Sequence, residues 1–404
     1  MIPKQQSQTE FIILMASLMS IVALSIDAIL PALDAIGISI GITEFTDKRL
    51  LITMIFLGLG FGQLIFGPLS DSIGRKPVIY IGFTLFVLAS FLCVIATSLE
   101  MMIVGRILQG IGLSAPRTIS IAMVRDSFSG DYMAKIMSFI VAIFIIIPVV
   151  APALGKLMLD TFGWRSIFNS QLIFGAIIMI WLWKRQPETL NPKHKIKLSK
   201  TLFISGFKEF MKFKTAIAFT LISGFITGSF MVYLSVADQI FQIQYGMVEE
   251  FPYLFAALAI SVGFATFLNG KFVLKYGMYK LVFAFMISFT AIPVLYLIIF
   301  FGQPNPNVYI LLTFFGLQFF SIGFLFGNLR SLAMQPLGHI AGIGAAINGF
   351  VSTIMAVPIA TYIGGFVTNT AYPLFIGFLI CGCCSLLILW ILGRNTKQVA
   401  LKTT

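Results

Sequence analysis

Charged residues are scarce in this chain of 404 residues. Only 10% of the residues are Asp, Glu, Lys or Arg, and 58% are hydrophobic. Soluble domains carry roughly 25% charged residues, so the composition excludes an ordinary soluble domain. The mean hydropathy of +0.99 indicates a polytopic membrane protein instead, whose spans use most of the chain and leave no room for a soluble catalytic domain.

Histidine and cysteine are also rare, which narrows the possible chemistry. The two histidines, His194 and His339, fall in predicted loops, and this disfavours a histidine proton relay across a membrane. All four cysteines lie in apolar runs, and the group at 381–384 has no His or carboxylate nearby. We interpret them as small apolar residues rather than metal ligands. We therefore expect no metal and no cofactor.

Two motifs of ATP-driven and metal-dependent enzymes are missing. The sequence has neither a G-x-x-x-x-G-K-[ST] phosphate loop nor an H-E-x-x-H pair. A channel is disfavoured as well, because no selectivity loop is repeated. We expect a protein that is not an enzyme, and a membrane sensor without transport remains an alternative to a transporter.

Twelve apolar runs are each long enough to cross a hydrocarbon core of about 30 Å. The polar first ten residues and the lack of a cleavage site predict that the first run is retained as a span. The runs cover residues 11–33, 49–69, 78–98, 101–122, 135–158, 165–183, 213–237, 248–270, 280–300, 308–329, 342–366 and 372–393.

Basic residues outnumber acidic ones by 27 to 15, and their placement is uneven. Nine of them lie between Lys184 and Lys214, whereas the loops on the other side are nearly free of them. This positive-inside pattern predicts a multi-pass protein of the bacterial inner membrane with both termini in the cytoplasm. No basic stripe is interleaved with exposed aromatics, so we do not expect nucleic acid as a partner.

The polar stretch 184–212 lies near the middle of the chain. Pro187 and Pro192 at its beginning end the sixth run. Apolar residues at helical spacing in 200–212 predict a helix that lies flat on the inner leaflet, whereas 188–199 reads equally well as a solvated linker. The predicted organisation is a first half over 1–183, a cytoplasmic linker with an interfacial helix over 184–212, and a second half over 213–404.

A glycine pair supports this division. Gly67 and Gly74 follow the second run, and Gly270 and Gly277 repeat their spacing 203 residues later, after the eighth run. Two six-span halves related by an axis along the membrane normal explain the repeat. The predicted fold is therefore an all-α polytopic membrane protein with 12 transmembrane helices in two pseudo-symmetric halves.

Ionisable side chains within spans are costly and are candidates for function. Asp27 lies in the first run and Arg106 in the fourth. Asp27 can serve as a proton carrier if its surroundings change between two open states, whereas an aspartate in headgroup water at a helix end is the alternative. Arg106 is its natural partner or an organiser of the substrate site. A purely structural arginine bonded to backbone carbonyls is the other reading.

Residues 67–77, from the end of the second run to the start of the third, read G-P-L-S-D-S-I-G-R-K-P and match G-x-L-x-D-x-x-G-R-K at every fixed position. Shorter motifs lie at 26–33, 106–110, 124–126, 152–155, 163–165 and 335–342. Together they make the whole chain resemble the major facilitator superfamily. Within it, the chain is most similar to the twelve-span drug–proton antiporters of the bicyclomycin-resistance (Bcr/CflA) type.

The resemblance implies roles for individual residues. Asp27 would be the protonation site and Arg106 the proton-relay arginine. A cytoplasmic gate would lock the N-terminal half in the outward-facing state through an inside charge cluster of Asp71, Arg75 and Asp126. The full set of residues expected at this gate is Gly67, Asp71, Gly74, Arg75, Lys76 and Asp126.

The fifth span departs from the family's antiporter signature, G-x-x-x-G-P-x-x-G-G. Isoleucine and alanine precede Pro148 and Pro152 where the signature has glycine, and Lys156 follows Gly155 in place of the final glycine. In the family this helix seals the transporter against leakage and is associated with export, so the departure bears on the direction of transport. A lysine at this place would also favour an anionic substrate.

These observations predict a secondary active transporter that exports drugs or other small amphipathic compounds by proton-coupled alternating access. Its partners would be a small-molecule substrate, protons and the lipid bilayer, and we expect a monomer. The alternative on the same fold is a proton-coupled importer, or symporter, of a metabolite or siderophore. The candidates for the substrate cavity, chosen from their positions in the spans, are Gln63, Gln109, Arg117, Tyr233, Gln318 and Asn348.

Overall fold

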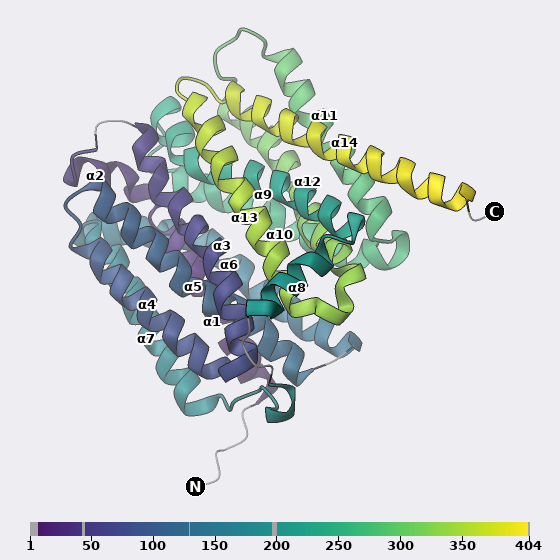
Figure 1. Ribbon diagram of the computed structural model, residues 1–404. Helices are drawn as coiled ribbons and strands as arrows, with labels where there is room; N and C mark the ends of the chain where they lie inside the picture. Colours follow the sequence, from purple (N-terminus) through teal and green to yellow (C-terminus); the bar gives the residue numbers. More distant parts are fainter. Residues whose placement is uncertain (1–6, 43–44, 129, 196–199, 403–404) are drawn as a thin grey trace. The chain divides into compact units, whose positions relative to one another are not determined.

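The computed structural model describes residues 7–42, 45–128, 130–195 and 200–402. Within these ranges the only regular elements are helices (Figure 1). Eleven helices of the described part are long and apolar enough to cross a membrane. The twelfth predicted span, 135–158, falls in α6 (Gly130–Phe162), where several side chains lie outside the description. The predicted all-α membrane architecture is confirmed.

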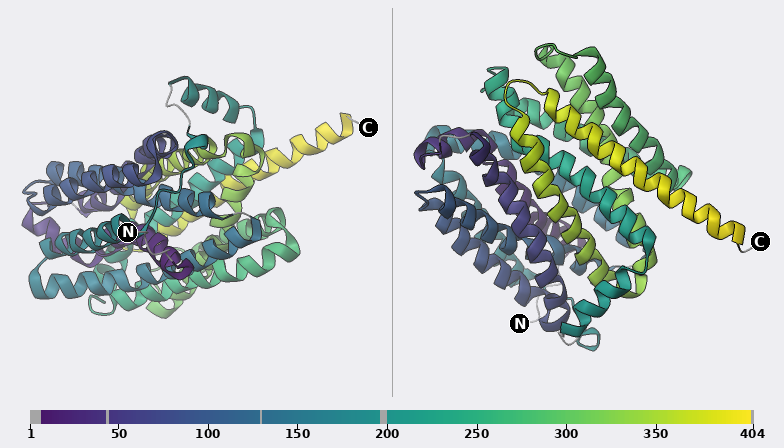
Figure 2. Two further views of the ribbon diagram at one scale, coloured as in Figure 1. Left: turned by 90° about the horizontal axis from the view of Figure 1, so that it is seen from below. Right: turned by 45° about the horizontal axis from the view of Figure 1, so that its top comes forward.

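The chain forms two compact units. Unit 1 comprises residues 1–199 and 249–256, and unit 2 comprises residues 200–248 and 257–404. The helices of unit 1 run alongside one another as a bundle (Figure 2). They are α1 (Gln8–Asp27), η1 (Leu30–Ala32), α2 (Leu33–Ser39), α3 (Phe45–Ile73), α4 (Arg75–Val94), α5 (Leu99–Ser127), α6, α7 (Arg165–Arg185) and η2 (Pro192–His194).

The first predicted span is a broken helix. Pro31 has no N–H to donate to the carbonyl of Asp27, four residues earlier, and its ring crowds that carbonyl. The α-helix accordingly ends at Asp27 and continues after η1 as α2, up to Ser39. Pro31 of the D-x-x-L-P sequence thus places the break of the helix at Asp27.

Glycines bring α5 into backbone contact with its neighbours. A methyl group on Gly110 would overlap the carbonyl oxygen of Ile55 in α3, and one on Gly58 would overlap that of Ile107 in α5. On another face of α5, a methyl group on Gly112 would approach the carbonyl oxygen of Gly82 in α4. Small residues at such crossings let helix backbones touch, as is common in membrane bundles.

The segment between the second and third spans is shorter than the sequence suggests. Residues 67–73 are the last two turns of α3, and Gly74 alone separates α3 from α4. Gly74 has φ +119° and ψ 160°, and Gly277 has φ +78° and ψ 152° at the matching junction of α10 and α11. The sequence repeat is therefore also a repeat of backbone conformation, which glycine adopts readily.

Unit 2 is built around aromatic side chains. The Tyr233 and Phe319 rings are 4.6 Å apart, and Phe375 stacks on Phe315 and Tyr296 at 5.3 and 3.7 Å. In Figure 2, α14 runs beside α11, and the Tyr372 hydroxyl donates to the Leu297 carbonyl there. The helices associated with this unit are α8 (Lys200–Phe210), α9 (Lys214–Asp238), the π-helical turn η3 (Gln239–Gln244), α10 (Phe251–Tyr276, after its first six residues), α11 (Met278–Ile299), α12 (Val308–Met334), η4 (Gln335–Ile340), α13 (Ala341–Phe366) and α14 (Tyr372–Lys402).

The second part of the predicted linker forms the helix α8. Phe210 at its end is buried in an apolar cluster with Ala216, Leu337 and Ile347. Ile204 and Phe207 are exposed, and lysines flank them in the sequence. That this exposed face lies on a lipid surface remains a prediction.

We expect Gly110→Ala to lower the melting temperature of the purified protein. The new methyl group would overlap the Ile55 carbonyl oxygen and force α3 and α5 apart, and overpacking of this kind costs typically about 1–3 kcal/mol. Gly316→Ala in α12 is the matched control, because no atom lies within 4 Å of its added methyl group. It should leave stability unchanged or raise it by up to about 1 kcal/mol. Equal melting temperatures of the two variants would contradict the glycine-mediated packing.

Candidate functional site

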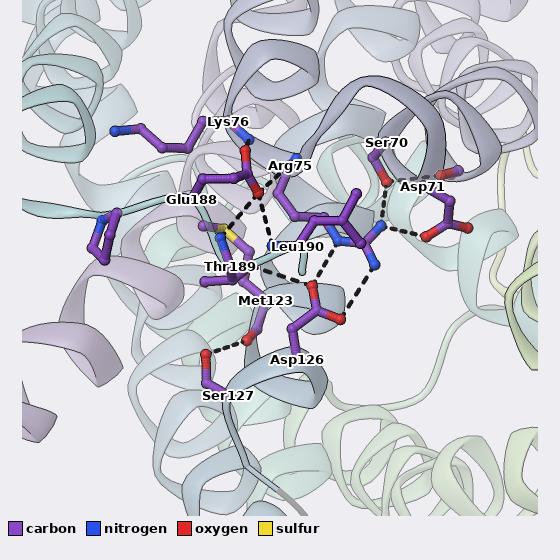
Figure 3. Close-up of polar contacts among 12 residues, drawn as sticks. Ser70, Asp71, Arg75, Lys76, Met123, Asp126, Ser127, Glu188, Thr189 and Leu190 are labelled. Carbon is purple, nitrogen blue, oxygen red and sulfur yellow. Dashed lines mark hydrogen bonds and ion pairs between the residues drawn. The ribbon is translucent and has the colours of Figure 1, made fainter. Parts of the chain in front are cut away.

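Four side chains meet where α3 gives way to α4, and we call them the junction cluster: Ser70, Asp71, Arg75 and Asp126 (Figure 3). Arg75 Nη1 donates to Asp71 Oδ1 at 2.5 Å and to Ser70 Oγ at 2.7 Å. Arg75 Nε and Nη2 donate to the two carboxylate oxygens of Asp126 at 2.7 and 3.3 Å. This fork-to-fork pairing is the strong form of an arginine–carboxylate contact. The charge cluster implied by the resemblance is thus assembled, and its role as a gate remains a prediction.

The other residues predicted at the gate have different surroundings. Lys76 Nζ donates to the backbone carbonyl of Gln186. Gly74 is confined by its positive φ and by Glu188, whose Oε2 would lie 2.9 Å from a methyl group added there. Gly67 has open space around its Cα, since no atom lies within 4 Å of an added methyl group. Of the two glycines, only Gly74 is therefore at a position where a larger residue would be strained.

Glu188 is a residue that sequence reasoning missed. It lies in 188–199, for which a solvated linker was one of two equally good readings, yet its carboxylate accepts hydrogen bonds from the backbone N–H groups of Arg75 and Lys76 at 3.0 Å each. The next residue, Thr189, donates its hydroxyl to Asp126 Oδ2 at 3.2 Å. A sequence motif reveals partners that lie close together in the chain. Glu188 and Lys76, and Thr189 and Asp126, are more than 60 residues apart.

Asp27 is buried at the end of α1, with 5% of its surface exposed. Its carboxylate has no hydrogen bond or ion pair with any residue in the described ranges. The carbonyl of the next residue, Ala28, lies against Gly155 of α6, where a methyl group would overlap it. A carboxylate at a helix C-terminus also faces the negative end of the helix dipole. The location of Asp27 therefore offers its charged form little stabilisation.

Arg106 is fully buried and cross-links three helices. Its Nε donates to the Leu51 carbonyl of α3 at 2.7 Å, and its Nη1 donates to the Ser25 carbonyl of α1 at 3.0 Å and to Gln109 Oε1 at 2.9 Å. It forms neither an ion pair nor a hydrogen bond with Asp27 in the described part of the chain. The geometry thus corresponds to the structural reading, an arginine bonded to backbone carbonyls. Its relay role stays a prediction.

The fifth-span motif lies in α6, which contains both Pro148 and Pro152. Gly155 provides the close contact with α1 described above. Lys156 Nζ lies 3.2 Å from Asp160 Oδ2 and 3.2 Å from Glu249 Oε1, both in unit 1. Two carboxylates already offset the charge of this lysine, so its surroundings do not single it out as the counter-ion of an anionic substrate.

Five of the six residues proposed for the substrate cavity are buried, and three of these five donate hydrogen bonds within their own unit. Gln109 donates to Ser90 Oγ at 2.7 Å, Gln318 to the Phe289 carbonyl at 3.1 Å, and Asn348 to Thr220 Oγ1 at 2.7 Å. These bonds join neighbouring helices. Tyr233 is buried among phenylalanines, Gln63 is buried in α3 and Arg117 is partly exposed in α5. Contact of any of the six with substrate remains a prediction.

We expect Arg106→Lys to destabilise the protein, because one lysine Nζ cannot reach acceptors in both α1 and α3 together with Gln109. Losing two charge-assisted hydrogen bonds in a buried site costs roughly 3 kcal/mol, which should lower the melting temperature measured by intrinsic fluorescence. Arg125→Lys, an exposed change near the end of the same helix, should have no effect. An unchanged melting temperature in Arg106→Lys would contradict the cross-linking role.

Comparison with known proteins identifies a family and several relatives of this chain. The family model described as Major Facilitator Superfamily matches residues 13–360. A bicyclomycin resistance protein homolog of Haemophilus influenzae is 26% identical over an alignment of 412 residues, which covers 98% of this chain and 99% of that protein. Multidrug resistance protein MdtL of Escherichia coli is 26% identical over 402 residues, covering 97% and 98% of the two chains.

Solved structures show the same fold. A partially occluded inward-open structure of the xylose transporter XylE from E. coli superposes with a TM-score of 0.71. The match covers 94% of this chain and 97% of XylE, at 14% sequence identity. Identity this low shows the fold alone. The family match spans most of the chain, and the sequence belongs to the major facilitator superfamily of membrane transporters.

Proposed function

We propose that this transporter couples the inward movement of protons to the export of drugs or other small amphipathic compounds. That the chain is a multi-pass transporter of small molecules follows from its family. The finer proposal is supported by relatives named for bicyclomycin and multidrug resistance, although they are only 26% identical. The motifs of the first and fourth spans support it as well, whereas the fifth span departs from the antiporter signature at Ile147, Ala151 and Lys156. The proposal includes a monomer in the bacterial inner membrane with both termini in the cytoplasm, as the distribution of basic residues predicts.

Asp27 is the observation that carries the proposal. It combines burial, a carboxylate without a partner among the residues that the structure describes, and a position at the break of a spanning helix. An ionised carboxylate is expensive to keep in such a site, so protonation and deprotonation of Asp27 would change the free energy of the conformation that surrounds it. A transporter can use this change to link proton binding to the exchange between two states.

The junction cluster would supply the second part of the mechanism. In this conformation Arg75 of α4 donates to Asp71 of α3 and to Asp126 of α5. A movement of α4 relative to either helix would break these charge-assisted hydrogen bonds. Stabilising one conformation by such contacts is how a bistable gate is set. We propose that the cluster is this gate, as the family resemblance implies.

Asp27→Asn should abolish proton-driven efflux while the protein still folds and inserts, because asparagine has nearly the same shape but cannot bind or release a proton. Efflux of ethidium from cells that lack their own pumps measures this effect. Asp34→Asn is the matched control, since Asp34 lies seven residues further on and is paired with Lys48 at 2.5 Å. The control should still export. Unchanged efflux in Asp27→Asn would remove this residue from the mechanism.

The direction of transport can be tested separately with inverted membrane vesicles. When the vesicle lumen is acidified, an antiporter should accumulate ethidium, because protons leaving the lumen drive the dye inward. A symporter under the same gradient should not. Accumulation only under a reversed gradient would overturn the proposal of export and favour proton-coupled import.

A further inference from the structure

A short segment after α7 is attached to the junction cluster at several points, and we call residues 186–190 the strap. The Glu188 carboxylate accepts from two amides of α4, and Asp126 accepts from the Thr189 hydroxyl (Figure 3). The Gln186 carbonyl accepts from Lys76 Nζ. Leu190 at its end is buried. The strap therefore lies on the cluster as an ordered segment, although its sequence reads as linker.

The first turn of α4 lacks a cap of its own. The residue at the N-cap is Gly74, which has no side chain, and the third helical residue is Pro77, which has no N–H. Two orphan amides are left, those of Arg75 and Lys76. Glu188 Oε1 accepts from the first and Oε2 from the second, both at 3.0 Å. A carboxylate at this place satisfies both amides and also complements the helix dipole.

The same carboxylate shapes the strap itself. Glu188 Oε1 accepts from the backbone N–H groups of Thr189 and Leu190 at 2.9 and 3.0 Å. This local turn directs the Thr189 hydroxyl to Asp126 Oδ2, the oxygen that also accepts from Arg75 Nε. The Glu188 side chain thus holds the backbone of Arg75 in place. It also positions Thr189, which contacts Asp126, the ion-pair partner of Arg75.

We propose that Glu188 is the positioning residue of the junction cluster, and that through it the strap couples the linker to the gate. That the junction cluster is a gate rests on the proposed function. That Glu188 positions the junction cluster rests on its hydrogen bonds alone. If the strap detaches, the first turn of α4 loses both acceptors and Asp126 loses the Thr189 hydroxyl. The Arg75–Asp126 pair is then held only by its own two hydrogen bonds.

The first test is hydrogen exchange of the purified protein, which needs no substrate. In Glu188→Gln the amides of Arg75 and Lys76 should exchange about fivefold faster, the factor that corresponds to a cap worth about 1 kcal/mol. Amides in the middle of α4 should not change. Glu188→Asp, whose shorter side chain cannot reach both amides, should give an intermediate rate. The control Glu250→Gln changes an exposed carboxylate that has no ion pair in the described part of the chain, and it should have no effect.

The second test separates a positioning residue from a mere cap. Maximal ethidium efflux and its apparent KM are measured for Asp126→Asn, for Glu188→Gln and for the double variant. If Glu188 acts through the cluster, both single changes lower the maximal rate with little change in KM. The double variant should then be no slower than Asp126→Asn alone, because residues that act as one unit are not additive.

Three results would decide against the inference or its basis. Unchanged exchange at Arg75 and Lys76 in Glu188→Gln would overturn the whole inference. Faster exchange together with additive losses of efflux would overturn the positioning role. If the unmodified protein moved no ethidium, the proposed function would fail for that compound, whereas the exchange result would still decide whether Glu188 holds the start of α4.

Discussion

The guanidinium of Arg75 sets the structure at the junction of α3 and α4. Its side chain is only 3% exposed, and a buried cation that lacks acceptors is costly. Ser70 and Asp71 from the end of α3 and Asp126 from the end of α5 meet this demand. Because the three acceptors lie on two helices, the cation fixes the ends of α3 and α5 with respect to the start of α4.

Two buried charged residues of unit 1, Asp27 and Arg106, differ in how many partners the described part of the chain supplies to them. Arg106 donates to acceptors on α1, α3 and α5 and behaves as part of the packing. One of its nitrogens, Nη2, is buried without a hydrogen-bond partner among the described residues. Asp27 has no partner there at all. This contrast supports the proposal that Asp27 carries the proton and that Arg106 serves packing.

The fold was largely predictable from the lengths of the apolar runs, and the resemblance to the family implied that Asp71, Arg75 and Asp126 would lie together. Apolar length predicts spans, and the G-x-L-x-D-x-x-G-R-K spacing places Asp71 and Arg75 four residues apart, on either side of the turn at Gly74. The substrate cavity stays a prediction, because a buried Gln or Asn has the same sequence pattern whether it faces a ligand or a neighbouring helix. Gln318 and Asn348 bond to neighbouring helices. Glu188 was missed since its partners are backbone amides, which carry no sequence signal.

The anchoring of the strap has a consequence for the reach of the chain. Leu190 is buried in unit 1, and α8, which begins at Lys200, is held in unit 2 by Phe210. The chain between Leu190 and Lys200 is ten peptide steps long, and an extended chain covers at most about 3.3–3.6 Å per residue. The two attachment points can therefore never be more than about 35 Å apart while both remain attached. The length of this peptide thus sets an upper limit on the distance between Leu190 and Lys200 in every conformation that the protein can adopt.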